Sequence, residues 1–273
     1  MQQRKITFIG AGNMAQAIVA GLIEGGYPAS KVSVCAPSGK HRDVLAARYG
    51  VTSSDDNARC AQEADVIVLA VKPQLMASVC EALRPQVDFT GKLVLSIAAG
   101  ISIARFQALL GEQLNIVRIM PNTPSLVGKG MSGLYAPAVV SETDRAFTAG
   151  LMESVGKVCW VENESGINGV IAAAGSAPAY FFLFMEAMQQ EAMRQGFDQD
   201  TARLLVQQAA TGAAALVEAN PDTPLSTLRE NVTSKGGTTA QALQVFNERQ
   251  LTQTVSAAMQ AAVNRAQEME KLF

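Results

Sequence analysis

The sequence predicts an α/β domain with a doubly wound parallel sheet, followed by an all-α domain. Short apolar runs alternate with helical patterns over the first half of the chain, and these runs stop after about residue 160. A glycine-rich segment follows the first run directly. Strands that alternate with helices are typical of a parallel sheet with right-handed crossovers. We therefore predict an α/β domain at residues 1–160 and a helical domain at residues 161–273.

Five apolar runs predict the strands of the sheet. They are rich in β-branched residues, and several are continuously apolar, as expected for strands that are buried on both faces. The runs are Ile6–Ile9, Val32–Cys35, Val66–Val71, Leu93–Ile97 and Ile116–Met120. Between the first two, Met14, Ile18 and Leu22 form a helical stripe that ends at a pair of glycines.

The second half of the chain predicts helices only. It is rich in Ala, Gln, Met and Glu, with apolar residues three and four positions apart. The predicted helices are Ala179–Gln195, Gln199–Ala219, Thr238–Glu248 and Leu251–Leu272. Faces rich in Ala and Met can pack closely against a second copy, so we expect a homo-oligomer built on dimers through this half.

Composition and charge exclude several classes of partner. The formal net charge is -2, which argues against nucleic acid and anionic membranes, since both attract a clustered basic face. The first five residues lead directly into a strand and have no apolar signal core. The longest weakly charged run, Val170–Met185, contains Gly175, Ser176 and Pro178, so it predicts a buried helix after a turn. We expect a cytoplasmic protein.

Cysteine and histidine usage excludes further chemistry. The four cysteines, Cys35, Cys60, Cys80 and Cys159, have no CxxC spacing and predict free thiols in a reducing compartment. The single histidine, His41, lies between two cations and is expected to be solvated. A Ser-His-Asp triad or a centre with several histidine ligands is therefore excluded, and no metal site is expected.

The first strand ends in a G-x-G-x-x-A motif, Gly10-Ala11-Gly12-Asn13-Met14-Ala15. At a strand-to-helix turn, Gly10 permits the tight turn, Gly12 lets a pyrophosphate approach the backbone, and Ala15 lets helix and strand pack closely. The helix N-terminus then offers free N–H groups to the phosphates. The motif predicts a nucleotide site in a Rossmann-type domain; the alternative is a purely structural glycine turn.

The end of the second strand indicates which nucleotide binds. NAD enzymes usually carry an acid there for the ribose 2′-hydroxyl. Here Ala36–Arg42 contains no acid, and Ser38, Lys40 and Arg42 can hydrogen-bond or pair with a 2′-phosphate. We therefore predict NADPH, with NADH as a weaker alternative; ordinary solvated charges are the other interpretation.

Three further loops follow predicted strands, where ligands collect in an open α/β sheet. They are Ala70–Pro73, Ala98–Gly100 and Met120–Pro124. Small residues in the first two leave room for a nicotinamide ribose, and the prolines of the third stiffen it. Taken alone, each loop is equally well explained as an ordinary connection.

The order of these segments resembles that of pyrroline-5-carboxylate reductases along essentially the whole chain. The most specific segments are Gly175–Tyr180 and Ser234–Thr239. The resemblance implies reduction of 1-pyrroline-5-carboxylate to L-proline with NAD(P)H, the last step of proline biosynthesis. It also implies a helical domain for substrate binding and dimerisation, and assembly into higher oligomers.

Residue by residue, the resemblance implies two sets of contacts. The cofactor set, with Lys40 and Arg42 added from their charge, is Ile9, Gly10, Ala11, Gly12, Asn13, Met14, Ser38, Lys40, Arg42, Asn57, Ala70, Val71, Lys72, Pro73, Ile97, Ala98 and Ala99. The substrate set is Ser234, Gly236, Gly237, Thr238 and Thr239, with Thr239 beside the imine nitrogen as the catalytic residue. Asn122 is added to this set because we expect its loop, Met120–Thr123, to line the substrate ring. Two positions depart from the family pattern: Lys235 replaces a proline and Ala177 replaces a glycine.

The glycine loop before the third predicted helix supports a carboxylate site independently. Ser234–Thr239 presents N–H groups and hydroxyls without bulk at the glycines, before a helix expected to start near Ala240. A plain helix cap is the alternative. A β-hydroxyacid dehydrogenase would need a lysine well inside a helix, and past residue 160 only Lys235 and Lys271 occur. A non-catalytic NADPH-binding regulator would not need this loop.

Overall fold

The computed structural model describes Gln2–Leu272 and forms two compact units. One unit runs to Ser176 and resumes at Ala261; the other spans Ala177–Gln260. The last strand ends at Trp160, where the predicted domain boundary lies, whereas the compact units separate at Ser176. The division into a cofactor domain at residues 1–160 and a substrate and dimerisation domain at residues 161–273 therefore stays a prediction.

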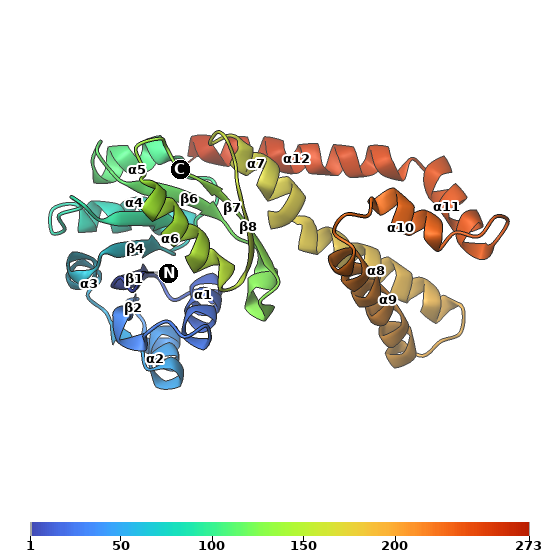
Figure 1. The fold of residues 1–273 in the computed structure, drawn as a ribbon, viewed down its shortest axis with the longest axis horizontal. Coiled ribbons are helices and arrows are strands. Elements are labelled where there is room, and N and C mark those ends of the chain that lie inside the picture. Colours follow the sequence, from blue (N-terminus) through green and yellow to red (C-terminus); the bar gives the residue numbers. More distant parts are fainter. Residues whose placement is uncertain (1, 273) are drawn as a thin grey trace. The chain divides into compact units, whose positions relative to one another are not determined.

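The first unit is built on a single eight-stranded sheet (Figure 1). The strands are β1 (Ile6–Ile9), β2 (Val32–Cys35), β3 (Thr52–Ser54), β4 (Val66–Leu69), β5 (Leu93–Ser96), β6 (Ile116–Met120), β7 (Gly130–Tyr135) and β8 (Gly156–Trp160). Their spatial order is β3-β2-β1-β4-β5-β6-β7-β8, and among these strands only the β6–β7 pair is antiparallel. The predicted doubly wound parallel sheet is confirmed.

Helices cover both faces of this sheet. They are α1 (Asn13–Glu24), α2 (Gly39–Tyr49), α3 (Asn57–Glu63), α4 (Pro73–Leu83), α5 (Ile103–Leu110), α6 (Glu142–Glu153) and α7 (Gly166–Val170), with short 3-10 turns η1 (Ala29–Lys31) and η2 (Thr123–Val127). Alternate strand residues feed two cores: Val66 and Val68 pack with α1 and α6, while Ile67 and Leu69 pack with α3, α4 and α5. This alternation explains why the central runs are continuously apolar.

Five of the described helices begin at a residue whose side chain caps the helix. Ser38, Asp56, Ser102, Ser141 and Asp198 each accept a backbone N–H in the first turn of α2, α3, α5, α6 and α9. Such caps satisfy donors that the helix itself leaves unpaired. Glycine, by contrast, precedes α1 and α11. The N-terminal arm is tied to α6: Arg4 pairs with Asp144, and Asn115 donates to the same carboxylate at 3.0 Å.

The second unit is helical, as predicted. It contains α8 (Ala177–Arg194), α9 (Gln199–Ala219), α10 (Leu225–Asn231), α11 (Thr238–Glu248) and the start of α12 (Leu251–Leu272), whose end belongs to the first unit. The predicted bounds of α9, α11 and α12 are confirmed. The helix α10 and the strands β3, β7 and β8 were not predicted from the sequence.

The prediction of a buried helix after a turn at Val170–Met185 is wrong. Instead of a turn, a π-helical stretch, Ile171–Gly175, joins α7 to α8, and Gly166–Arg194 runs as one helix. Against the described part of the chain α8 buries none of its residues, and Phe181 is 67% exposed. By length and composition alone this one helix could cross a membrane, which is weak evidence because core helices of soluble proteins pass the same test.

Candidate active site

In the turn after β1, the backbone of Gly10 lies close to the backbones of Cys35 and Ala70. Gly10 has φ +112°, its N–H donates to the Cys35 carbonyl at 2.7 Å, and a Cβ there would lie 2.6 Å from the carbonyl oxygen of Ala70. Only glycine avoids both the unfavourable φ and the overlap. The requirement predicted for Gly10 therefore follows from the contact between the ends of β1, β2 and β4.

The N-terminus of α1 is open. Gly12 precedes the helix with φ -69° and ψ 173°, and no side chain from Gln2–Leu272 caps it. No described atom lies within 4 Å of the point where a Gly12 Cβ would stand. The first N–H groups of α1 and the positive end of its dipole therefore face free space, which suits a pyrophosphate. Ala15, 1% exposed, packs in the core below, as predicted.

Strand pairing brings the predicted cofactor loops together. β4 lies between β1 and β5, with Leu69 level with Ile9 on one side and Ser96 on the other. Because all three strands are parallel, the segments Gly10–Met14, Ala70–Pro73 and Ile97–Ala99 leave the sheet at the same edge. Lys72 caps α4 through its backbone and Pro73 occupies the first turn.

The three residues predicted to bind the 2′-phosphate, all after the end of β2, differ in their surroundings. Ser38 and Lys40 are exposed; the Ser38 hydroxyl accepts the Lys40 N–H at 3.3 Å. The Arg42 guanidinium instead donates to the Ala36 carbonyl and, at 3.3 Å, to Asp43. Ser38 and Lys40 are thus free to meet a phosphate, while Arg42 holds the loop that carries them.

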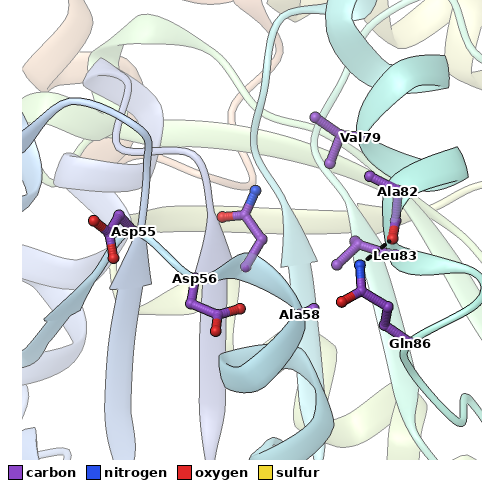
Figure 2. Close-up of a pocket in the computed structure, with 8 residues that line it drawn as sticks. Asp55, Asp56, Ala58, Val79, Ala82, Leu83 and Gln86 are labelled. Carbon is purple, nitrogen blue, oxygen red and sulfur yellow. Dashed lines mark hydrogen bonds between the residues drawn. The ribbon is translucent and has the colours of Figure 1, made fainter.

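Asn57 lies at the start of α3 and lines a shallow groove of about 330 Å³ (Figure 2). Its Oδ1 is buried and has no hydrogen-bond partner in the described part of the chain. The groove continues over the end of α4 at Leu83 and beyond it to Gln86. Apart from Asn57, its lining residues are not among the predicted cofactor contacts. The orphaned oxygen is consistent with a ligand at Asn57, but the groove as a whole is not the predicted site.

Asn122, predicted to line the substrate, is already engaged within the first unit. It is 8% exposed; its Nδ2 donates to the Ala174 carbonyl at 3.0 Å and its Oδ1 accepts the Met131 N–H at 2.8 Å. Ala174 lies four residues before Pro178, which has no N–H to offer that carbonyl. Asn122 therefore supplies the hydrogen bond to the Ala174 carbonyl that Pro178 cannot make. Ala174 lies within the π-helical stretch Ile171–Gly175.

The glycine loop of the second unit forms a second open helix N-terminus. The Gly237 N–H donates to the Ser234 carbonyl at 3.0 Å, and Gly236 has φ +73°. Thr238 and Thr239 are the first two residues of α11, as the predicted range Thr238–Glu248 requires; the loop alone had suggested a start near Ala240. No side chain of the described residues caps it, and both threonines are exposed.

The thiols and the titratable groups do not add a further centre. Cys35, Cys60 and Cys80 are buried and Cys159 is half-buried, and all four are free. Burial raises the pKa of the Cys35 and Cys80 thiols to about 12, which keeps them protonated. Within Gln2–Leu272 no three acidic, cysteine or histidine side chains cluster as metal ligands.

One buried charge in the first unit was not predicted from the sequence. Arg118 lies within β6, is 1% exposed and pairs with Glu164 and Glu270. The available signal was a single cation inside an otherwise apolar run, Ile116–Met120. Its partners could not be predicted because both lie far away along the chain.

Two family patterns match the chain. Residues 164–269 match the family described as pyrroline-5-carboxylate reductase dimerisation, and residues 5–100 match that described as NADP oxidoreductase coenzyme F420-dependent. A pyrroline-5-carboxylate reductase of Vibrio alginolyticus is 65% identical over 273 residues, covering 100% of both chains.

Solved structures agree along the whole chain. A pyrroline-5-carboxylate reductase of Coxiella burnetii superimposes with a TM-score of 0.94 at 41% identity, covering 98% of this chain and 99% of that one. A Plasmodium falciparum pyrroline carboxylate reductase with NADP bound gives 0.86 at 28% identity over 99% of both. With open glycine-flanked helix termini in both units and this match from end to end, the chain belongs to the pyrroline-5-carboxylate reductase family.

Proposed function

We propose that this chain reduces 1-pyrroline-5-carboxylate to L-proline with NADPH, the last step of proline biosynthesis. The observation that carries the proposal is the open N-terminus of α1 beside the loops after β4 and β5, in a chain that is a pyrroline-5-carboxylate reductase by family. The residues present fit NADPH: open space at Gly12 that a methyl group would enter, exposed Ser38 and Lys40 at the end of β2, and the buried Asn57 oxygen without a partner in the described part of the chain.

Bound NADPH supplies a hydride to the ring carbon of the C=N bond. The N–H groups of α1 hold the pyrophosphate, and the exposed pair Ser38 and Lys40 holds the 2′-phosphate. The loops Ala70–Pro73 and Ile97–Ala99 hold the nicotinamide end. NADH, which lacks the 2′-phosphate, is used less well.

The glycine loop before α11 holds the substrate. Backbone N–H groups of Ser234–Thr238 bind the carboxylate, helped by the positive end of the α11 dipole. The Thr239 hydroxyl hydrogen-bonds the ring nitrogen: its oxygen accepts the N–H of the protonated imine, and its O–H can donate to the lone pair that forms on nitrogen as the hydride arrives. A cyclic imine is protonated by water, so the site does not require an acidic side chain.

The test is the loss of reduced-nicotinamide absorbance with pyrroline-5-carboxylate and NADPH, and proline is identified as the product. A panel of 3-hydroxyacids with NADP, read in the reverse direction, tests the β-hydroxyacid dehydrogenase alternative. Turnover of a 3-hydroxyacid without turnover of the imine overturns the proposal. Tight NADPH binding with no turnover of either substrate supports the regulator instead.

We also propose a cytoplasmic homo-oligomer built on dimers through the helical unit. Support comes from α8, whose Phe181, Phe182 and Leu183 are 63–67% exposed, and from the dimerisation pattern at residues 164–269. Exposed large apolar side chains gathered on one helix are typical of interfaces between subunits. Light scattering is expected to give a dimer or a multiple of it. A fully active monomer of 28.8 kDa would contradict the proposal.

A further inference from the structure

Arg118 joins two acidic side chains from distant parts of the chain inside the first unit. Its Nη1 lies 3.0 Å from Oε1 of Glu164, just before α7, and 2.8 Å from Oε1 of Glu270, in the last turn of α12. Asn168 donates to the second oxygen of Glu270 at 3.4 Å. We call Arg118, Glu164 and Glu270 the Arg118 cluster.

The Arg118 cluster is poorly explained by stability alone. Arg118 is 1% exposed, and its Nε and Nη2 have no partner in the described part of the chain. Burying a guanidinium is costly, and ion pairs of this kind are often no more stabilising than apolar side chains of similar volume. A cluster that leaves two buried donors unpaired is better explained by the geometry that it imposes.

The Arg118 cluster and the neighbouring Met269 hold the segment between β5 and α5 at two points. Oε1 of Glu164 accepts the Ile103 N–H at 2.7 Å, at the start of α5. Met269, next to Glu270, packs on Gly100: a Cβ on Gly100 would lie 2.9 Å from that of Met269, and φ there is +74°. The loop Ile97–Ala99 is thus anchored by β5 on one side and by these contacts on the other.

We propose that the Arg118 cluster, together with Met269, positions the loop Ile97–Ala99 to receive the nicotinamide end of the cofactor. The proposal rests on the proposed function, because that function assigns the loop to NADPH. Glu270 and Met269 are positioning residues in this view: they act through the loop. The C-terminal turn of α12 therefore sets how well the nicotinamide half binds, while the adenosine half binds at the end of β2.

The test compares two ligands on two variants of the full chain. Dissociation constants are measured by titration for NADPH and for 2′,5′-ADP, which keeps the 2′-phosphate and lacks nicotinamide. Glu270→Gln keeps the shape and removes the charge, and Met269→Ala removes the packing on Gly100. For each variant the NADPH constant is expected to rise roughly 3- to 30-fold while that for 2′,5′-ADP stays within about twofold.

Glu268→Gln is the matched control. Glu268 lies in the same turn, is 60% exposed and pairs with Arg265 at 2.8 Å on the surface, so both constants are expected to stay at wild-type values. If both ligands weaken together, the cluster only maintains the fold and the proposal is overturned. Unchanged NADPH binding in both folded variants overturns it as well.

Failure of the proposed function is recognised separately. Wild-type protein that binds NADPH but does not oxidise it with pyrroline-5-carboxylate contradicts the function, whereas the two binding constants do not depend on that substrate. If Glu270→Gln does not fold, Met269→Ala, which leaves the ion pairs in place, decides the question by the same two constants.

Discussion

Two glycines of the same motif, Gly10 and Gly12, are expected to respond in opposite ways to alanine. At Gly12 the backbone has φ -69° and ψ 173°, which alanine adopts freely, and no described atom lies within 4 Å of the new methyl group. The free energy of unfolding of Gly12→Ala should therefore change by no more than about 0.5 kcal/mol. The methyl group takes the space of the pyrophosphate, and overlap of about 1–3 kcal/mol raises the NADPH dissociation constant about 5- to 150-fold.

At Gly10 the same change should damage the fold. Its φ of +112° costs an alanine about 1–2 kcal/mol, and its Cβ would stand 2.6 Å from the Ala70 carbonyl oxygen. Overlap with backbone adds about 1–3 kcal/mol, because a carbonyl cannot rotate away as a flexible side chain can. Gly10→Ala is thus expected to lower the free energy of unfolding by about 2–5 kcal/mol.

Urea unfolding of both variants without ligand, and NADPH titration of each under folding conditions, separate the two effects. The expected pattern is a wild-type unfolding midpoint with weak NADPH binding for Gly12→Ala, and a clearly lowered midpoint for Gly10→Ala. If Gly12→Ala keeps wild-type NADPH affinity, the pyrophosphate does not approach this helix and the reasoning is refuted. Overlap with buried atoms typically costs about 2 kcal/mol. If Gly12→Ala lowers the free energy of unfolding by about that much or more, the argument that its methyl group meets open space is refuted.

Three further changes test the other parts of the site and the fold. Thr239→Val should lower kcat about 30- to 1000-fold, the equivalent of about 2–4 kcal/mol of lost hydrogen bonding in the transition state, with NADPH binding unchanged; near-full kcat would remove Thr239 from the chemistry. Asn122→Leu leaves the Ala174 carbonyl and the Met131 N–H unpaired, and should cost about 1–3 kcal/mol in urea unfolding for each buried group; an unchanged midpoint would contradict the assigned contacts. Burial by itself would raise the pKa of Asp144, but hydrogen bonds from Arg4, Asn115 and Ser141 outweigh it and hold that pKa below its ordinary 3.8. Because the folded-state pKa is lowered, this stabilisation is present above the unfolded-state pKa and is lost as pH falls through the folded one. The difference in unfolding free energy between wild type and Asp144→Asn should therefore be about 1.5–3 kcal/mol at about pH 7 and shrink towards about pH 3, and a difference independent of pH would contradict it.

Local sequence signals were sufficient for the elements whose formation depends on their own residues. The strands β1, β2 and β6 were predicted to the residue because each is a run of four or five mostly apolar residues, rich in β-branched side chains, as expected for strands of a parallel sheet buried on both faces. The helices α9, α11 and α12 were predicted to the residue because each is a stretch of helix-forming residues with apolar positions three and four apart. Turn residues mark some of their ends, since α9 stops before Asn220-Pro221 and α11 follows Gly236-Gly237. The G-x-G-x-x-A motif likewise contains, in six residues, all that the turn after β1 requires.

Elements that depend on a partner were not predictable in the same way. β3 has only three residues, Thr52–Ser54, and β7 contains two glycines, so neither has the apolar pattern of a buried strand; pairing with the existing sheet forms them. The proline in the Gly175–Tyr180 segment suggested a turn, yet the helix continues there. Asn122, more than fifty residues earlier in the chain, satisfies the carbonyl that Pro178 leaves free.

By itself, the sequence determined the doubly wound sheet, the helical second half, the nucleotide motif and the family. These follow from periodicity, from glycine positions and from residue types at short spacing, all of which act over a few neighbouring residues. Only the tertiary structure decided that Arg42 braces its own loop, that Asn122 bonds to the helix of Ala174, and that Arg118 meets Glu164 and Glu270. The physical reason is that a hydrogen bond or ion pair is set by distance in space, which residue spacing along the chain does not determine for long-range partners.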